Sequence, residues 1–486
     1  MQQPTLSSFY LKIAILCLYL ASCAPSPQES EPRRPNVLLI MCDDLGWGDV
    51  GFNGHPHIQT PNLDQLANQG LVLNRFYSAS PVCSPTRASV MTGRSPYRMA
   101  IPNANAGHLP PEEVTIAEIL QSQGYATGHF GKWHLGTLTT MVNDANRGRP
   151  GDTTHYAIPA TSGYDTYFCS ESKTPTWDPM IKPMVFEEAI GESLRYGWAA
   201  IETAETAVED YGTFYWKGPE QREYENLNGD DARIIMDRVI PFIKEAVATQ
   251  KPFFSTIWFH TPHLPLVTGK KYRDLYPNQP LPEQLLYGSI SAMDEQVGRL
   301  WQQLKTLGVA ENTMLWFCSD NGPERDTPGS AGPFRERKRS LYEGGIRVPA
   351  FVLWQKEIQA GGKSEVPMVT LDYLPTILDY LNIPYPVANR PMDGLSLRAI
   401  LAGKQKVRNQ AIGFQYPKKI AWMTDQYKLI STDEGQTFEL YDLLADKEET
   451  QNIATQFPER VNEMRQALES WKAACTKSET GADYVK

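Results

Sequence analysis

Short apolar runs that alternate with amphipathic stretches constrain the fold of this chain most strongly. Each run is brief, mostly apolar and without charged residues, as expected for strands that are buried on both faces of a largely parallel sheet. The runs cover residues 37–41, 253–259, 314–317 and 350–354. Apolar residues recur at helical spacing at 60–70, 231–250 and 286–307. This alternation predicts an α/β fold with a mixed, mostly parallel central sheet flanked by helices.

The C-terminal part of the chain follows a different pattern. Turn signals separate four short strand-like runs at 411–416, 420–424, 427–431 and 437–441. A helix predicted after Pro458 has an apolar face formed by Val461, Met464, Leu468 and Trp471. We therefore predict a main domain at residues 35–385 and a smaller α+β subdomain at 386–486, with the helix packed on an antiparallel sheet.

Residues 137–229 show neither pattern. They have little periodicity and are rich in glycine, proline and aromatic residues. We expect long loops and short helices there, in the kind of region where ligand specificity is commonly located.

The N-terminus has the residue order of an export signal. Lys12 precedes an apolar run at 13–20 that is too short to span a bilayer. The run ends in Leu-Ala-Ser-Cys, which resembles the bacterial lipobox and predicts lipidation of Cys23. The alternative is a secretory signal that is cleaved near Ala24.

The lipobox divides this segment into a signal peptide at residues 1–22 and a flexible tether at 23–34 that begins with the lipidated cysteine. The protein is then an exported bacterial lipoprotein, in the periplasm or at the outer membrane and cell surface. Its expected contact with the membrane is the lipid anchor alone.

Composition narrows the class of protein further. Hydrophobic residues make up 41% of the 486 residues and charged residues 21%, which excludes a largely disordered chain. The formal net charge of −10 argues against a surface for nucleic acid. An anionic ligand would therefore need a local cluster of cations.

Five of the seven cysteines lie beyond the signal, and their spacing is neither that of a disulfide framework nor that of a zinc site. We expect most of them to be small buried apolar residues. They are Cys42, Cys83, Cys169, Cys318 and Cys475. Cys83 stands apart because of its neighbours.

Polar residues follow the apolar runs at the points where the predicted strands end. The four pairs concerned are Asp43-Asp44, Lys132 with His134, His260 with His263, and Asp320-Asn321. Because ligands bind beyond the carboxyl ends of parallel strands, we expect these groups to meet at one edge of the sheet.

The acidic groups among them predict a metal site. Asp43, Asp44, Asp320 and Asn321 offer only oxygen ligands, which suits Ca²⁺, or with less preference Mg²⁺, rather than zinc. Taken singly, each pair is also typical of a turn or a helix N-cap.

The basic groups predict an anion site. Lys132, His134, His263 and Lys338 provide the donors that a tetrahedral oxyanion needs. Lys338 lies in a charged run at 335–339, and a solvated surface is the simpler interpretation of that run alone.

The stretch PVCSPTR, at residues 81–87, places Cys83 at the start of a predicted helix that ends near Gly93. The helix N-terminus and Arg87 favour an anion there, and predict a lowered pKa for the thiol. A thiolate beside a hard cation is nevertheless an unusual pairing.

The motifs together resemble the type I sulfatases of the alkaline phosphatase superfamily. The C-x-P-x-R signature is found at Cys83 to Arg87, and a second signature, Gly-Lys-Trp-His-Leu-Gly, at 131–136. Further similar segments lie at 35–46, 60–64, 262–263, 319–322, 342–349 and 439–443. The resemblance extends over nearly all of the mature chain and makes 35–385 the expected catalytic domain.

This resemblance implies that a maturation enzyme converts Cys83 to formylglycine, whose hydrated form attacks sulfur, expels the alcohol and then releases sulfate. It implies that Asp43, Asp44, Asp320, Asn321 and the modified Cys83 hold one Ca²⁺. Arg87 and His134 would orient and assist the nucleophile, whereas Lys132, His263 and Lys338 would bind the sulfate. Glu336 and Arg337 depart from the family pattern, which usually has glycines there.

The expected substrate is a sulfated carbohydrate, either an algal polymer such as ulvan or carrageenan or an animal glycosaminoglycan. Sugar contacts are predicted for Trp177, Arg147, His155 and Arg195, although each has an equally good structural interpretation. One alternative is a phosphate or phosphonate ester hydrolase of the same superfamily. A second is a non-catalytic surface lipoprotein that binds sulfated glycans.

Overall fold

A ten-stranded mixed sheet forms the centre of the protein, in the order β13-β2-β12-β11-β1-β10-β4-β5-β8-β9. The structure is a computed structural model that describes residues 34–185, 198–199 and 209–484. Residues 35–486 form one compact unit, so the boundary predicted at 385/386 stays a prediction. The signal peptide, Cys23 and Arg195 lie outside the described residues.

The middle of the sheet is parallel, and three of its strands are those predicted from the apolar runs: β1 (Asn36–Cys42), β10 (Phe253–Trp258) and β11 (Thr313–Ser319). The other two parallel strands are β4 (Ala126–Lys132) and β5 (Thr166–Ser170). Every residue of β1, β10 and β11 is buried. Strands without a polar face have to be covered on both sides, which explains the layered architecture.

Shorter strands extend this parallel centre on both sides. On one side lie β12 (Phe351–Leu353), β2 (Leu71–Leu73) and β13 (Gly362–Ser364), and on the other β8 (Tyr215–Gly218) and β9 (Gln221–Arg222). β12 is antiparallel to β11, and β8 is antiparallel to β5. The predicted mixed, mostly parallel sheet is therefore confirmed.

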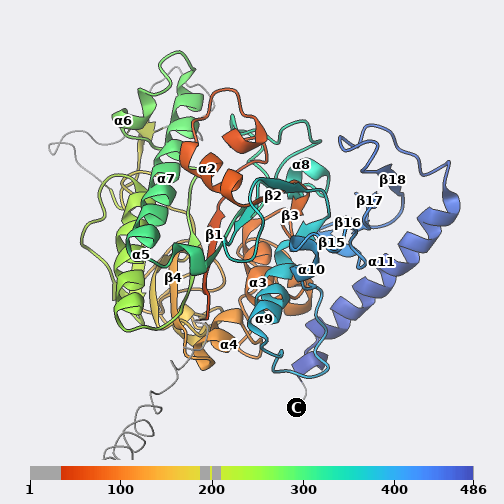
Figure 1. The fold of residues 1–486 in the computed structure, drawn as a ribbon, viewed down its shortest axis with the longest axis horizontal. Coiled ribbons are helices and arrows are strands. Elements are labelled where there is room, and N and C mark those ends of the chain that lie inside the picture. The colour runs from red at the N-terminus through yellow and green to blue at the C-terminus, as the bar shows by residue number, and fades with distance from the viewer. Residues whose placement is uncertain (1–33, 186–197, 200–208, 485–486) are drawn as a thin grey trace, which may run out of the picture. The chain divides into compact units, whose positions relative to one another are not determined.

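Two groups of helices cover the sheet (Figure 1). The first contains α2 (Pro61–Gln69), α5 (Asp231–Ala248) and α7 (Leu281–Thr306), which pack on one another. The second contains α3 (Cys83–Thr92), α4 (Ile116–Ser122) and α9 (Tyr373–Leu381). The three helices expected from periodicity are confirmed as α2, α5 and α7; α7 begins earlier than expected because Pro280 and Pro282 suit a helix start.

The expectation of loops and short helices at 137–229 is wrong in part. This region contributes β5, β8 and β9 to the edge of the sheet. These strands are short, and β8 has a bulge against β9. The alternation of apolar and polar residues is therefore too brief to be recognised in the sequence. Pairing with β4, rather than local pattern, makes this segment extended.

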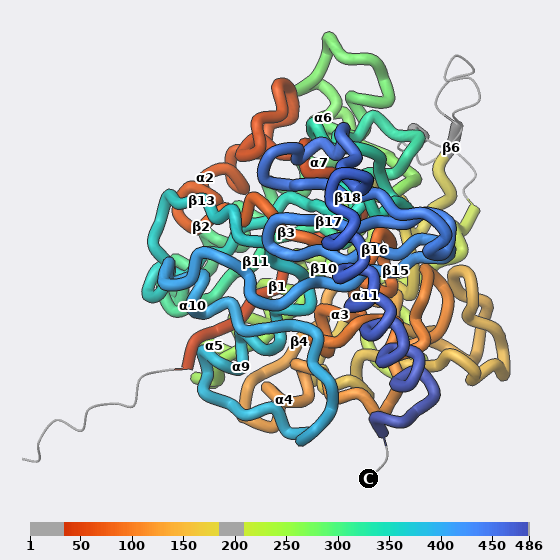
Figure 2. The backbone as a smooth tube through the Cα atoms, turned by 90° about the vertical axis from the view of Figure 1, so that its right-hand side faces the viewer, coloured from red at the N-terminus to blue at the C-terminus, as the bar shows by residue number. Residues whose placement is uncertain are grey.

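The C-terminal sheet has the four antiparallel strands expected: β15 (Ile412–Tyr416), β16 (Lys419–Met423), β17 (Tyr427–Ser431) and β18 (Glu439–Asp442). Helix α11 (Pro458–Glu479) lies along it (Figure 2). Met464 packs with Leu429 and Leu440, and the rings of Trp471 and Trp422 are 6.2 Å apart. The predicted apolar face of α11 is therefore the packing face.

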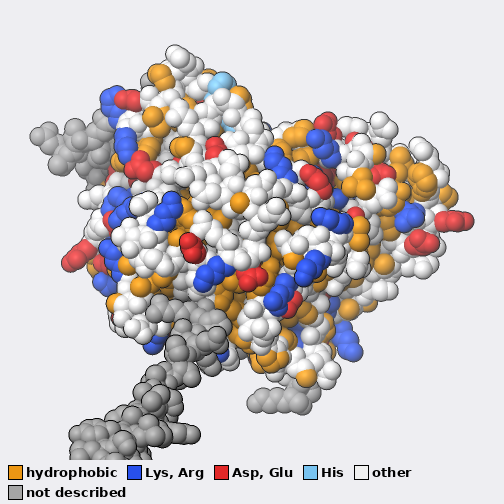
Figure 3. All heavy atoms as spheres, viewed as in Figure 1, with side chains coloured by type: hydrophobic (Ala, Val, Ile, Leu, Met, Phe, Trp, Pro, Cys, Tyr) orange, Lys and Arg blue, Asp and Glu red, His pale blue; other side chains and the backbone are white. Residues whose placement is uncertain are grey.

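The surface mixes charges of both signs. Figure 3 shows lysine, arginine and acidic side chains interspersed across the face drawn there. Among the described residues, no helix has the length and apolar character needed to cross a bilayer.

Leu468→Ala is expected to lower the free energy of unfolding by about 2–5 kcal/mol, because Leu468 is fully buried on the packed face of α11. Leu444→Ala is the matched control, since Leu444 is 61% exposed, and it is expected to change stability by less than about 0.5 kcal/mol. Denaturant unfolding measures both values. Equal effects of the two substitutions would contradict this packing.

Candidate active site

The register of the central sheet brings the predicted polar groups to one edge. Cys42 of β1 pairs with Ser319 of β11, so Asp43 and Asp320 leave the sheet side by side. Gly131 of β4 pairs with Trp258 of β10, so Lys132 reaches the same edge. The backbone N–H of Asp43 donates to the carbonyl of Thr261 at 3.1 Å, which holds the segment after β10 against it.

Three buried carboxylates and one amide form the acidic half of the site. Asp43 and Asp320 are fully buried and Asp44 is 3% exposed. Asp44 has φ +66°, and its backbone N–H donates to Asp320 Oδ1 at 3.2 Å. Asn321 Nδ2 donates to Asp44 Oδ1 at 2.7 Å. The left-handed turn at Asp44 is thus fixed from the end of β11.

Two fully buried cations face these carboxylates. Arg87 Nη2 lies 2.7 Å from Asp320 Oδ2 and 3.7 Å from Asp43 Oδ1, with its guanidinium over the ring of Trp258 at 5.1 Å. Lys132 Nζ donates to Asp43 Oδ2 at 2.6 Å. Such charges are stable in a protein interior only when they are paired and hydrogen-bonded, as these are.

The carboxylates respond differently to this environment. Burial opposes ionisation of Asp43, but the cations, led by Lys132, outweigh it and hold its pKa well below the usual range. Burial, followed by the charge of Asp43, raises the pKa of Asp320. Asp43 is therefore the more strongly stabilised anion of the two.

Lys338 belongs to the site and not to a solvated surface run. Its Nζ lies 2.6 Å and 2.7 Å from the two carboxylate oxygens of Asp44, and the side chain is 4% exposed. Burial opposes its charge, but Asp44 raises its pKa above the usual value. Glu324 supports Lys338 at 3.6 Å and receives a bond of 2.9 Å from Arg339 Nη2.

Cys83 opens helix α3 and lies inside the cluster. Its sulfur and ligand atoms of Asp43, Asp44 and His263 all lie within 4.8 Å of one another. The lowered thiol pKa expected from the helix N-terminus is wrong: burial raises the pKa of Cys83 to about 12, although Lys132 opposes this. Loss of hydration therefore outweighs the helix dipole.

The oxygen atoms of this site fit a hard divalent cation. Asp43 Oδ1 and Asn321 Oδ1 are buried and have no hydrogen-bond partner within the described residues, although buried polar atoms are almost always paired. With Asp44 and Asp320 they form a donor set of carboxylate and amide oxygens, which Ca²⁺ prefers. The Cys83 sulfur, a soft atom, lies in the same cluster as Asp43 and Asp44.

The two histidines of the site have assignable tautomers. His134 Nε2 lies 2.8 Å from Asn105 Oδ1, an acceptor, so Nε2 bears the proton; its Nδ1 is buried without a partner among the described residues. His263 Nδ1 lies 2.6 Å from the carbonyl of Leu264, so its Nε2, 3.6 Å from Asp44, bears the lone pair. Burial lowers the pKa of His263 to about 4. Burial, followed by the charge of Lys132, also holds the pKa of His134 well below its usual value.

The residues proposed for sugar contacts have structural partners. Arg147 forms an ion pair with Glu171 at 2.9 Å, and Trp177 packs against Gly269 and Tyr272. His155 Nδ1 lies 3.3 Å from His108 Nδ1. These contacts favour the structural interpretation for all three.

Sequence reasoning missed several residues around the site. Lys173 follows β5, and its pKa is lowered by burial and by the charges of Lys132 and Lys338, so it lies within the field of the anion site. Asn105, Glu324 and Trp258 were also missed. Lys173 was missed because β5, the strand it follows, was not recognised from the sequence. Glu324 lies two residues after the Asn-Gly pair, but only the fold shows that this position is close to the site.

Such a site, at the carboxyl edge of an α/β sheet, defines a hydrolase that binds a tetrahedral anion. A sulfatase family model matches residues 35–383, and the model "N-sulphoglucosamine sulphohydrolase, C-terminal" matches residues 332–474. The chain is 32% identical to human arylsulfatase A over 419 residues, 82% of this chain and 74% of the relative. It is 30% identical to dog (Canis lupus familiaris) N-acetylgalactosamine-6-sulfatase over 432 residues, 85% and 74% of the two chains.

A solved structure has the same architecture. The structure titled Ps i-CgsB in complex with k-i-k-neocarrahexaose has a TM-score of 0.73 and 26% identity, over 90% of this chain and 93% of that one. The chain belongs to the sulfatase family, with the alkaline-phosphatase-like fold that its resemblance implied, and it is a sulfuric ester hydrolase.

An unmodified Cys83 is expected to resist alkylation by iodoacetamide in the native protein at neutral pH, because the side chain is 2% exposed. In denaturant it should label fully. Peptide mass spectrometry measures labelling at each cysteine, and Cys475, also 2% exposed but outside the site, is the matched comparison. Rapid native labelling of Cys83 alone would contradict the buried geometry.

Proposed function

We propose that this enzyme hydrolyses sulfate esters of carbohydrates, using a formylglycine made from Cys83 and one bound Ca²⁺. The position of Cys83 carries the proposal: it lies among Asp43, Asp44 and His263, beside the buried cations Arg87 and Lys132. A hydrated aldehyde offers a hard oxygen there, which suits a carboxylate-rich metal site better than sulfur does. A maturation enzyme that recognises the C-x-P-x-R segment is the required partner.

When present, the hydrated formylglycine supplies the nucleophilic hydroxyl, and the divalent cation polarises that hydroxyl and a sulfate oxygen. The chain itself supplies fixed positive charge. Arg87, Lys132 and Lys338 are held by carboxylates, so they need no reorganisation when the sulfate binds. Burial strengthens their attraction for the anion because water screens it less.

The histidines handle protons at defined atoms. His134 has an unprotonated Nδ1 and accepts a proton there from the nucleophile, while Asn105 holds its Nε2–H. His263 presents the lone pair of Nε2 to the site, so in this tautomer it accepts a proton at that atom. Both assignments follow from the groups that occupy the opposite ring nitrogen.

Support for a carbohydrate substrate comes from the relatives. One relative is named N-acetylgalactosamine-6-sulfatase. The solved structure of Ps i-CgsB is titled as a complex with k-i-k-neocarrahexaose. The proposed substrate is a sulfated polysaccharide or oligosaccharide, with algal polymers such as ulvan or carrageenan preferred to animal glycosaminoglycans.

Matured wild-type protein is expected to release sulfate from sulfated oligosaccharides and from 4-nitrophenyl sulfate. Cys83→Ala should lower kcat by about a thousandfold or more, because it removes the nucleophile, without a large change in Tm. Ion chromatography of sulfate measures the turnover. Cys475→Ala, at an equally buried cysteine outside the site, should retain activity.

Two results would contradict this function. One is a large preference for aryl phosphate or phosphonate over aryl sulfate, which would favour the phosphorus ester hydrolases. The other is an intact thiol at residue 83 in protein isolated from its own host, found by peptide mass spectrometry. That result would favour a non-catalytic lipoprotein that binds sulfated glycans.

We also propose that the protein is exported and anchored through a lipid on Cys23. Cys23→Ser is expected to move it from the membrane fraction to the soluble fraction, because the lipobox then lacks the acceptor thiol. Cys17→Ser, within the apolar run, is the control and should leave the membrane association unchanged. Immunoblots of cell fractions measure both, and a membrane-bound Cys23→Ser protein would refute the anchor.

A further inference from the structure

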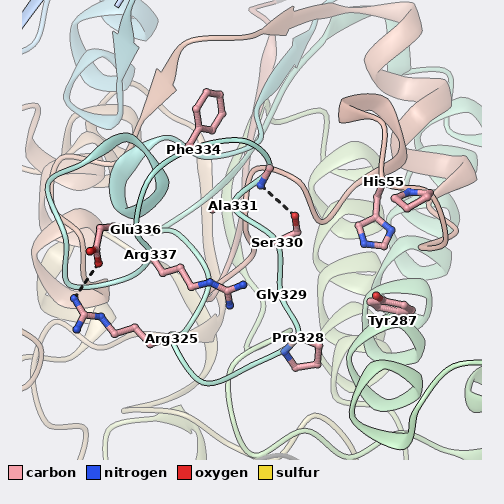
Figure 4. A pocket seen from close by; sticks show the side chains of 12 residues that line it. His55, Tyr287, Arg325, Pro328, Gly329, Ser330, Ala331, Phe334, Glu336 and Arg337 are labelled. Carbon is pink, nitrogen blue, oxygen red and sulfur yellow. Dashed lines mark hydrogen bonds and ion pairs between the residues drawn. The ribbon is translucent and has the colours of Figure 1, made fainter. Parts of the chain in front are cut away.

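An open cavity of about 640 Å³ lies outside the sulfate site. Its walls are the loop between β11 and α8 (Glu343–Ile346), the turn before α2, and Tyr287 of α7 (Figure 4). None of the residues proposed for catalysis or metal binding lines it. Its walls nevertheless include two arginines, a histidine, a glutamate and a tyrosine, which are side chains suited to binding a polar ligand.

Two arginines supply positive charge. The guanidinium of Arg337 extends toward Gly329 and Ser330 (Figure 4), and its Nη1 donates to the carbonyls of Thr327 at 2.8 Å and Glu324 at 3.3 Å. These bonds fix the arginine without neutralising it, because both acceptors are uncharged carbonyls. The buried carboxyl of Asp49 lies within electrostatic reach of Arg337, but burial raises the pKa of Asp49 to about 7, so it compensates the positive charge only in part.

The second arginine is only weakly paired. Arg325 Nη2 lies 3.5 Å from Glu336 Oε2, and both side chains are nearly half exposed, 47% and 45%. An ion pair of this kind contributes little, so a ligand anion can compete for the guanidinium. Glu336 has φ +64°, which places a carboxylate on a backbone conformation that favours glycine.

His55 adds an uncharged donor. Its Nδ1 accepts from the backbone N–H groups of Ile58 at 2.8 Å and His57 at 3.1 Å, so the ring proton is on Nε2. Burial and the neighbouring His57 lower the pKa of His55 to about 4, so it is neutral at neutral pH. Tyr287 packs against it at 5.1 Å and gives the cavity an aromatic wall.

The cavity is connected to the sulfate site through the same loops. Arg325 Nε donates to the carbonyl of Lys338 at 3.2 Å, so one loop presents Lys338 to Asp44 and the arginines to the cavity. The wall at Ser330 is tied to the segment that follows Asp44, because Asp49 Oδ1 accepts from Ser330 N–H at 2.7 Å. The same pair of loops therefore supports both the sulfate site and the cavity.

We propose that this cavity binds an anionic sugar unit of the substrate, beyond the sugar that carries the cleaved sulfate. Arg337 and Arg325 bind the sulfate or carboxylate substituent of that unit, while His55, Glu336 and Tyr287 contact its hydroxyl groups and ring. The donors, the single carboxylate and the aromatic wall match a charged sugar better than an apolar ligand. This inference rests on the proposed carbohydrate sulfatase activity.

The test compares a long substrate with a short one. Arg337→Gln keeps a side chain that can donate to the loop carbonyls but loses the charge. With a carrageenan hexasaccharide, whose anionic groups are sulfates, it is expected to raise KM about tenfold with little change in kcat, the effect of losing one charged hydrogen bond. With 4-nitrophenyl sulfate, which is too short to reach the cavity, kcat/KM should stay unchanged.

Two further variants sharpen the test. Arg337→Lys retains the charge and should recover part of the lost affinity. Arg465→Gln is the control, because Arg465 is an exposed arginine on α11 that does not line the cavity. Repeating the comparison with a chondroitin sulfate hexasaccharide, which also carries carboxylates, tells which anionic group the cavity prefers.

The outcomes separate the cavity from the activity. Two results would overturn the inference. One is an unchanged KM of Arg337→Gln for both hexasaccharides. The other is an equal loss of kcat/KM on hexasaccharide and aryl sulfate, which would mean that Arg337 acts through Lys338. If wild-type protein releases no sulfate from any substrate, the proposed function fails instead. Calorimetry with the two hexasaccharides then tests the cavity alone. Weaker binding by Arg337→Gln than by wild-type protein supports the inference, and equal binding by the two proteins refutes it.

Discussion

The charge balance at the carboxyl edge of the central sheet is the constraint on which the rest of the structure depends. The carboxyl groups of Asp43, Asp44 and Asp320 lie in a place from which water is excluded, and Arg87, Lys132 and Lys338 pair with them. Removing one partner of a buried pair typically costs about 3–5 kcal/mol, because the other charge is left uncompensated. The site is therefore a fixed electrostatic environment that binds an anion without rearranging.

Each part of the fold holds one side of this balance. The parallel strands fix Asp43, Asp320 and Lys132 through their register. Helix α3, in the second group of helices, contributes Arg87 and Cys83. The loop after β11 returns Lys338, with Glu324 behind it. The same loop forms the arginine-lined cavity, so the proposed sulfate site and the proposed sugar-binding cavity share one structural element.

How far the sequence predicts the molecule depends on the range of the interactions. The strands β1, β10 and β11 and the helices α2, α5 and α7 follow from local pattern, because their burial is periodic or complete. The strands β5, β8 and β9 do not, since they are short and extended only through pairing with neighbours. Lys173, next to β5, was missed for the same reason, and the thiol pKa of Cys83 was mistaken because burial cannot be read from a helix start.

The sequence by itself determined the α/β class, the chemistry of the oxygen and cationic groups, and their places at strand ends, because residue type and hydrophobic periodicity are local properties. Only the tertiary structure decided which charges meet. Lys338 contacts Asp44 across 294 positions of the chain, and Arg87 contacts Asp320 across 233. Pairing at that separation depends on sheet register and loop return, and these are fixed by the packing of the whole chain.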